Sequence, residues 1–250
     1  MGSTALSTNL QSNKQSNITT QRMPKRREIL EKKKAVDELI KAASAVKDHL
    51  ASFPSFRQFD TNGLSVYLES GRGDKLTSSL KRRLQNLLKD NMERHYGPEW
   101  AAEEKVKRWE MVTPEARHIL LYEASHNEEK VILDRDDSLV GFVHYRFTLE
   151  EGLPVLYVYE IQLESRVQGK GLGKFIMELL ELIARKNCMS SIVLTVQKAN
   201  VVAMNFYTSK LRYAISSISP SRVDPLIGAQ KNYEILCKAF DNEAKAILEA

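Results

Sequence analysis

The sequence predicts a mixed α/β domain, a mostly antiparallel sheet flanked by helices. Two observations support this fold class. Short apolar segments alternate with long helical stripes over residues 27–240. A strand, a glycine-rich turn and an amphipathic helix also follow one another directly over residues 154–186. The 250 residues are 28% charged and 42% hydrophobic, which is typical of a soluble globular protein and leaves no run long enough to cross a membrane.

The N-terminal quarter combines a polar tail with a helical stripe. Residues 1–26 are polar and then basic, so we expect a disordered tail. Over residues 27–50 the apolar positions follow a helical period, and we expect this helix to pack on the domain. Basic residues dominate between Arg22 and Lys34. Two interpretations stay open: a solvated helix face, or a segment for nuclear import or for contact with a nucleosome or ribosome.

The front half of the domain begins with a turn and a strand. Residues 60–63 have turn chemistry, and residues 64–68 alternate as a strand does. Thr77-Ser78 can cap a helix that runs to about Tyr96, where residues 95–100 break it into a loop. Three further strands are expected over residues 117–123, 139–147 and 155–163. The short Glu-Glu-Gly turn around Gly152 makes the last two antiparallel.

The back half of the domain begins with a long helix and continues with short strands. An amphipathic helix opens at Leu172 and carries apolar residues at i, i+3, i+4, i+7, i+8 and i+11. We expect a strand over residues 191–195, a helix over 201–210, strands over 213–216 and 233–239, and a tail over 241–250. Cys188 and Cys237 are too few for a disulfide framework or a zinc site, so we expect buried thiols in a reducing, intracellular protein.

Three glycines at 169, 171 and 173 form the turn before this helix. Glycine permits positive φ, and a helix N-terminus attracts anions, so the turn is suited to hold a phosphate beside Lys170 and Lys174. A P-loop needs four residues between its glycines, and here three intervene. The spacing also fails for a dinucleotide fold. A mere tight turn is the alternative.

Two motifs resemble the GNAT superfamily of N-acetyltransferases. They are Gln168-x-x-Gly171-x-Gly173 and, after a buried strand, Asn200-x-x-Ala203-x-x-Phe206-Tyr207. The resemblance implies the GNAT fold and acetyl-CoA as cosubstrate, with no metal. It implies coenzyme contacts at Ile161, Gln162, Leu163, Gln168, Gly169, Lys170, Gly171, Leu172, Gly173, Lys174 and Asn200. It also makes Tyr207 a candidate acid for the leaving thiolate.

The strand before the loop offers a candidate base. Acetyl transfer to an amine needs a group that takes the amine's proton, and Glu160 lies at the end of this strand. The alternative is a surface carboxylate paired with a lysine. Tyr157 and Tyr159 share a strand face, where they either pack in the core or line a peptide pocket and shuttle a proton.

A closer resemblance is to the histone-specific N-alpha-acetyltransferase D family. It rests on Val155-Leu-Tyr-Val-Tyr-Glu160-Ile-Gln-Leu-Glu-Ser165, Leu194-Thr-Val-Gln-Lys-Ala-Asn200 and Tyr233-Glu-Ile-Leu236, and covers about residues 27–240. It implies acetylation of the N-terminal serine of histone H4 and histone 2A, whose tails begin Ser-Gly-Arg-Gly, in the nucleus and cytoplasm. It implies that the peptide contacts Tyr96, Tyr159, Thr195 and Tyr233, and that Trp100 helps to wall the pocket.

This chain departs from the family at two positions. Thr148 stands where the family has an aspartate, so Glu150 or Glu151 is the candidate contact for the substrate arginine. Tyr207 replaces a phenylalanine of the family example. Two rival functions stay open: acetylation of internal lysines or small amines, and a non-catalytic acetyl-CoA-binding or chromatin-binding module.

Overall fold

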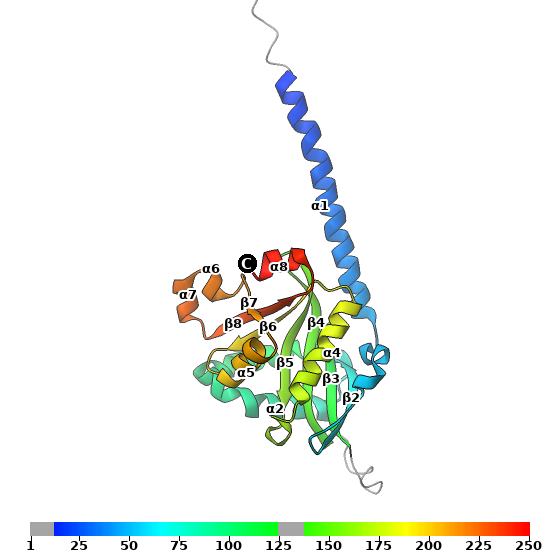
Figure 1. The fold of residues 1–250 in the computed structure, drawn as a ribbon, viewed down its shortest axis with the longest axis vertical. Coiled ribbons are helices and arrows are strands. Elements are labelled where there is room, and N and C mark those ends of the chain that lie inside the picture. The colour runs from blue at the N-terminus through cyan, green and yellow to red at the C-terminus, as the bar shows by residue number, and fades with distance from the viewer. Residues whose placement is uncertain (1–12, 125–137) are drawn as a thin grey trace, which may run out of the picture.

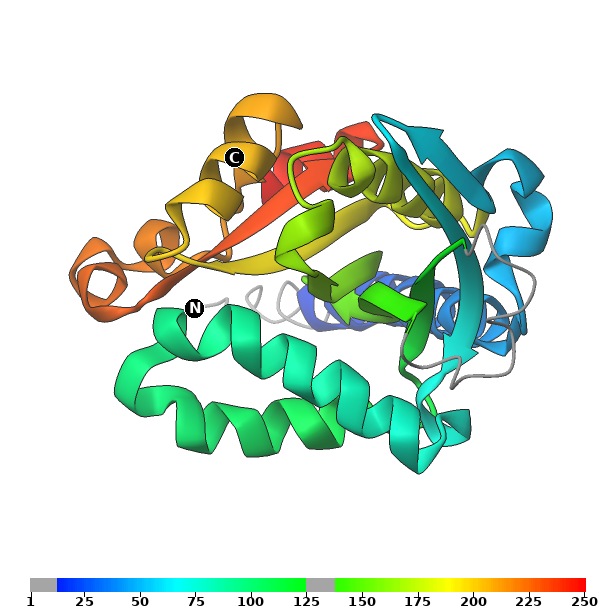
Figure 2. The same ribbon diagram turned by 90° about the horizontal axis from the view of Figure 1, so that it is seen from below.

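An eight-stranded sheet runs through the computed structural model, which describes residues 13–124 and 138–250. Side chains of the first helix are described from residue 26 onward. The strand order is β1-β2-β3-β4-β5-β6-β8-β7, and within the described strands only the β5–β6 pair is parallel. Helices cover both faces of the sheet (Figures 1 and 2). The predicted mixed, mostly antiparallel α/β fold is confirmed.

The strands are β1 Gln58–Thr61, β2 Leu64–Arg72, β3 Arg117–Glu123, β4 Leu139–Glu150, β5 Leu153–Leu163, β6 Ser191–Gln197, β7 Ala214–Ile215 and β8 Tyr233–Ala239. The helices are α1 Asn13–Ala45, α2 Ser78–Tyr96, α3 Trp100–Glu110, α4 Leu172–Lys186, α5 Val201–Asn205, α6 Pro220–Val223, α7 Pro225–Gln230 and α8 Asn242–Leu248. A π-helical turn, Phe206–Lys210, continues α5. Short 3-10 turns lie at His49–Ser52, Pro54–Phe56, Gly73–Lys75, Gly97–Glu99 and Ser165–Val167.

Helix α1 departs from the sequence prediction at both ends. It includes residues 13–26, which we expected as part of a disordered tail, because a helix already nucleated extends at little cost per residue. It ends at Ala45 because Asp48 caps a separate 3-10 turn. Only its C-terminal part packs on the domain: Ala43 is 3% exposed, whereas Ile29 is 68% exposed. The remainder projects from the body (Figure 1).

Two other segments fold where we expected loop or tail. Helix α2 ends at Tyr96, a 3-10 turn begins at Gly97 (φ 55°) and includes Pro98, and α3 begins at Trp100, four residues after the end of α2. Residues 241–250 are not a tail, because Asp241 caps α8 and Leu248 is fully buried. Strand β1, which we did not predict, pairs with β2 through the Asn62-Gly63 turn.

Three apolar clusters hold the layers together. The largest joins the end of α1 and the stripe of α4 to the sheet, as the spacing predicted, with Leu172, Ile176 and Ile183 fully buried. A second packs α2 against β3 and β4, and a third lies under α8. Cys237 is buried as expected, but Cys188 is exposed because it lies just past the end of α4. Across the described part of the chain, no helix is long and apolar enough to span a membrane.

Candidate active site

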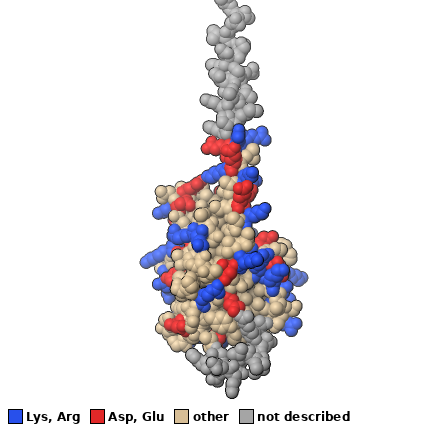
Figure 3. All heavy atoms as spheres, turned by 90° about the vertical axis from the view of Figure 1, so that its right-hand side faces the viewer, with Lys and Arg blue, Asp and Glu red and all other residues tan. Residues whose placement is uncertain are grey.

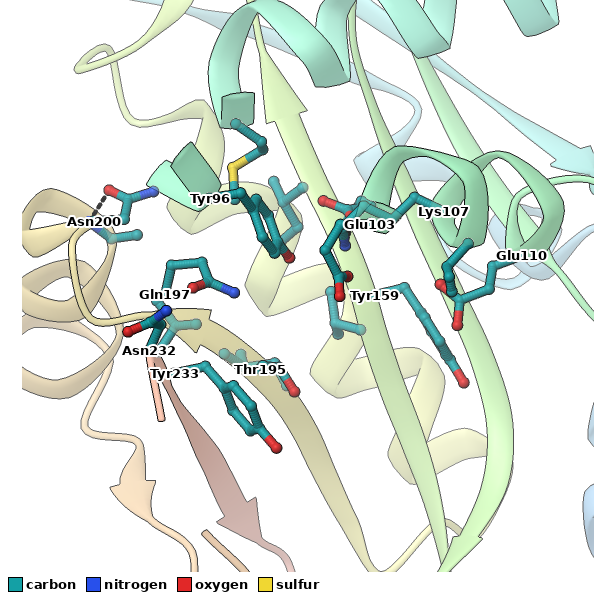
Figure 4. A pocket seen from close by; sticks show the side chains of 18 of the residues that line it. Tyr96, Glu103, Lys107, Glu110, Tyr159, Thr195, Gln197, Asn200, Asn232 and Tyr233 are labelled. Carbon is teal, nitrogen blue, oxygen red and sulfur yellow. Dashed lines mark hydrogen bonds and ion pairs between the residues drawn. The ribbon is translucent and has the colours of Figure 1, made fainter. Parts of the chain in front are cut away.

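A cavity of about 760 Å³ opens where the two parallel strands separate. The β5–β6 ladder starts at Val155 and Ser191 and ends at the pair Val158 and Leu194. Both strands continue beyond this pair, β5 to Leu163 and β6 to Gln197. The cavity occupies the gap between them, and α2, α3 and the segment before β8 form its other walls. Figure 4 shows side chains from these elements facing the same space.

A β-bulge in β5 turns the candidate base into this cavity. His144 pairs with Glu160 and Tyr145 pairs with Val158, so Tyr159 is the extra residue. Regular alternation would place Tyr159 and Glu160 on opposite faces of the sheet. The bulge shifts the register by one, and both residues line the cavity together with Tyr157. The shared face predicted for the two tyrosines is confirmed.

Glu160 is the buried centre of a polar network, with its side chain 6% exposed. Its Oε1 lies 2.5 Å from Lys107 Nζ of α3, and its Oε2 accepts a hydrogen bond of 2.8 Å from Gln162 Nε2. Asn91 Nδ2 of α2 donates in turn to Gln162 Oε1 at 2.9 Å. The carboxylate is paired with a lysine, but inside the cavity and not on the surface.

Burial and the carboxylate act in opposite directions on Lys107. Burial alone would lower the pKa of its ammonium, but Glu160 and Tyr96 outweigh burial and raise this pKa above its usual value. Burial, reinforced by the charge of Glu160, raises the pKa of Tyr207. Tyr207 therefore keeps its proton at neutral pH, and it lines the same cavity as Glu160.

The tyrosines and Thr195 expected to contact a peptide come together in the cavity. The Tyr157 hydroxyl lies 2.5 Å from Thr195 Oγ1, and burial raises the pKa of Tyr157 to about 12. Tyr159 stacks on His144 at 4.7 Å between ring centroids. Tyr96 and Tyr233 also line the cavity.

Trp100 does not wall the cavity, which corrects our expectation. It is 4% exposed and packs with the α2 core, 5.8 Å from the ring of Tyr96. The reason is its place at the first position of α3, where the helix turns its side chain under α2. Trp100 therefore supports Tyr96 from behind.

Other acidic side chains line the cavity together with Glu160. Glu103 and Glu110 lie on the same face of α3 as Lys107, at spacings of four and three residues, and point toward β5 (Figure 4). Glu150, at the end of β4, is a third; Glu151 and Thr148 are not among the lining residues. Burial raises the pKa of Glu110 and of Glu150.

The glycine loop lies outside this cavity, between the end of β5 and the start of α4. Gly169 and Gly171 have φ of 73° and 95°, which favour glycine. Asn62 Nδ2 donates to the Lys170 carbonyl at 2.9 Å and fixes the loop. The positive φ values, the fifteen-residue α4 and the two loop lysines suit the loop to an anion.

The remaining candidate coenzyme residues differ in whether they line the cavity and in which of their groups are free to contact a ligand. Ile161, Gln162 and Asn200 line the cavity, and Asn200 also caps α5 through the Ala203 amide. The Leu163 carbonyl already accepts hydrogen bonds from Asn91 and Gln168, and Leu163 does not line the cavity. The side chain of Leu172 is fully buried, so only its backbone can face a ligand. Gln168, Gly173 and Lys174 do not line the cavity.

Sequence reasoning missed Lys107 and Gln197. Lys107 belongs to α3, and we made no prediction for residues 101–110; the spacing of Glu103, Lys107 and Glu110 was the available signal. Gln197 is 6% exposed at the end of β6 and lines the cavity. Among the described side chains, no group of three or more His, Cys, Asp or Glu residues is arranged to hold a metal ion.

Comparison with known proteins gives one match to a family model. The acetyltransferase (GNAT) family model matches residues 84–212, just over half of the chain. Among solved structures, a GNAT-family acetyltransferase from Listeria monocytogenes is similar at 11% identity and a TM-score of 0.47, over 73% of this chain and 99% of that one.

Two Arabidopsis thaliana structures, each in complex with a bisubstrate analogue, are also similar. NAA60 has 13% identity and a TM-score of 0.47, and Naa50 has 20% identity and a TM-score of 0.43. Each alignment covers 70% of this chain and 99% of the other.

Proposed function

The chain belongs to the acetyltransferase (GNAT) family, and from this premise we propose that it acetylates the N-terminal amine of peptides that begin Ser-Gly-Arg-Gly, the tails of histone H4 and histone 2A. The observation that carries the proposal is a buried carboxylate in a cavity of about 760 Å³ whose lining includes several tyrosines and further acidic side chains. Acetyl-CoA is the proposed cosubstrate and supplies an activated thioester.

Glu160 and Tyr207 have different roles in the proposed acetyl transfer. Glu160 takes a proton from the substrate nitrogen as this nitrogen forms the new bond to the acetyl carbon and the carbon–sulfur bond breaks. Tyr207 holds a proton at its hydroxyl that it can give to the departing thiolate. An N-terminal amine has a pKa of about 7.7–8.0, so a carboxylate is a sufficient base.

Coenzyme and peptide would use different parts of the site. The backbone of residues 168–174 would hold the pyrophosphate at the start of α4, and Ile161 and Asn200 would border the pantetheine arm. Tyr96, Tyr159, Thr195 and Tyr233 would contact the peptide. Glu150 lines the cavity and Glu151 does not, so we assign the substrate arginine to Glu150 together with Glu110 of α3.

Acetylation of a synthetic Ser-Gly-Arg-Gly peptide tests the proposal. We expect fragment masses to place the acetyl group on the α-amine, and we expect Glu160→Gln to lower turnover strongly while acetyl-CoA binding persists. An acetyl group found only on internal lysines would favour the first rival function. Wild-type protein that binds acetyl-CoA but shows no turnover with any amine would favour the non-catalytic module.

The proposed setting is the nucleus and cytoplasm, with the basic segment as an import signal or a contact for nucleosomes or ribosomes. Its described side chains are exposed and several are paired: Arg27 lies 3.0 Å from Glu31, and Lys32 lies 2.5 Å from Glu243 of α8. Figure 3 shows charges of both signs interspersed on one face of the molecule. Loss of nuclear fluorescence after neutralising Lys33 and Lys34 in a tagged protein would support the import role.

A further inference from the structure

The floor of the cavity holds a cation where the acceptor amine must arrive. Lys107 Nζ lies 2.5 Å from the proposed base, and its side chain is only 13% exposed. Its ammonium also lies over the Tyr96 ring, 5.4 Å from the centroid. Gln162 occupies the second oxygen of Glu160. The carboxylate is therefore already neutralised before any substrate enters.

The groups that face this pair from α2, β4 and the π-helical turn add no negative charge to it. On α2, Tyr96 keeps its proton, because burial raises its pKa. On β4, burial holds His144 neutral by lowering its pKa, while Arg146 adds a cation above the Tyr159 ring. On the π-helical turn, Tyr207 is uncharged at neutral pH.

Further acidic residues lie on the walls of the cavity, and of these Glu110 is close enough to Lys107 and Arg146 for both cations to act on its pKa. Glu103 and Glu110 of α3 and Glu150 of β4 line the cavity, and Lys231 lies among the residues that line it near β8. A basic peptide can thus be attracted to the walls while a second ammonium at the floor meets the like charge of Lys107.

We propose that Lys107 makes this site select acceptors that enter as uncharged amines, and that it thereby favours N-terminal amines over lysine side chains. The inference rests on Glu160 as the base of the proposed function. At neutral pH the uncharged fraction of an α-amine exceeds that of a lysine side chain about 300-fold, given pKa values of about 7.9 and 10.4. Because the Lys107 ammonium repels charged acceptors, this difference in the uncharged fraction becomes a preference for N-terminal amines.

The test compares two peptides on four proteins. One peptide is Ser-Gly-Arg-Gly with a free N-terminus; the other has a blocked N-terminus and one internal lysine. The proteins are wild type, Lys107→Met, Lys107→Arg and Lys105→Met, the last a matched control because Lys105 is exposed on the same helix. The readout is the ratio of kcat/KM for the two peptides at about pH 7.5.

We expect Lys107→Met to lower this ratio by about tenfold or more, because an ammonium can then enter and pair with Glu160. Lys107→Arg and Lys105→Met should leave the ratio unchanged. A purely structural role would lower both rates together, and an unchanged ratio in Lys107→Met overturns the inference while the proposed function stands. Wild-type protein that prefers the lysine peptide overturns the proposed function instead.

A second measurement needs no variant and covers the case in which Lys107→Met does not fold. In wild-type protein, kcat/KM for the lysine peptide should rise about tenfold per pH unit between about pH 7 and 9, whereas the value for the α-amine peptide levels off near its amine pKa of about 8. A lysine-peptide rate that is flat over this range would show that the site accepts ammonium ions, and would overturn the inference.

Discussion

Glu160→Gln should destabilise the fold as well as lower turnover strongly. The substitution keeps the shape of the side chain but leaves Lys107 as a buried cation without a counter-charge. Breaking a buried ion pair in this way costs about 3–5 kcal/mol. The glutamine oxygen still accepts one hydrogen bond from Lys107, which offsets about 1 kcal/mol. We therefore expect a loss of roughly 2–4 kcal/mol in the free energy of unfolding, or a fall in Tm of about 5–15 °C for a chain of this size.

Urea unfolding at about pH 7, followed by circular dichroism, measures this loss. The pKa of Lys107 is raised in the folded state, so the stability that it contributes is complete below the unfolded pKa of 10.5 and disappears only as the pH rises beyond it. The double variant Lys107→Met with Glu160→Gln removes the stranded cation and should recover most of the stability without recovering turnover. A single variant within about 1 kcal/mol of wild type, or a double variant less stable than the single one, would refute this reasoning.

Three further perturbations probe the scaffold of the site. Burial lowers the pKa of His118 to about 4, so at acidic pH the unfolded chain binds a proton that the folded chain excludes. This histidine should therefore lower the free energy of unfolding by about 3 kcal/mol between pH 6.5 and 4. An equal dependence of the unfolding free energy on pH in wild type and His118→Gln would contradict this. Asn91→Ala removes the hydrogen bonds to Gln162 and the Leu163 carbonyl and should cost about 1–2 kcal/mol and some turnover, whereas exposed Asp90→Ala on the same helix should cost neither. In Gly141→Ala the new Cβ would lie 2.5 Å from Leu163 Cδ2; we expect a loss of about 2 kcal/mol in urea unfolding, and wild-type stability would speak against this packing.

The local sequence pattern was sufficient to predict those elements that bury one apolar face against the rest of the domain. The strands Arg117–Glu123 and Tyr233–Ala239 have the bounds that we expected, and α4 buries the stripe that its spacing predicted. The Gly152 turn and the antiparallel β4–β5 pair follow from the short connection between two apolar segments.

The parts that escaped prediction depend on contacts between distant segments. The bulge at Tyr159 is a property of the pairing between β4 and β5, and no spacing within β5 reveals it. The burial of Trp100 requires α3 to pack beside α2. The ion pair of Lys107 and Glu160 joins residues 53 positions apart. The sequence therefore predicts a role for Glu160 but not its partner, because their contact depends on the tertiary fold.

The sheet has a weak seam at its middle. Ten residue pairs join β4 to β5, whereas four join β5 to β6 before the strands separate. Local opening is easiest where a structure has the fewest contacts. Amide hydrogens of the β5–β6 ladder should therefore exchange with solvent faster than those of the β4–β5 and β6–β8 ladders. A ligand that touches both β5 and the β6–α5 connection bridges the two halves, and by mass action it stabilises their closed arrangement by RT ln(1 + [L]/Kd). A substrate bound in the gap between β5 and β6 would thus also hold the two halves of the sheet together.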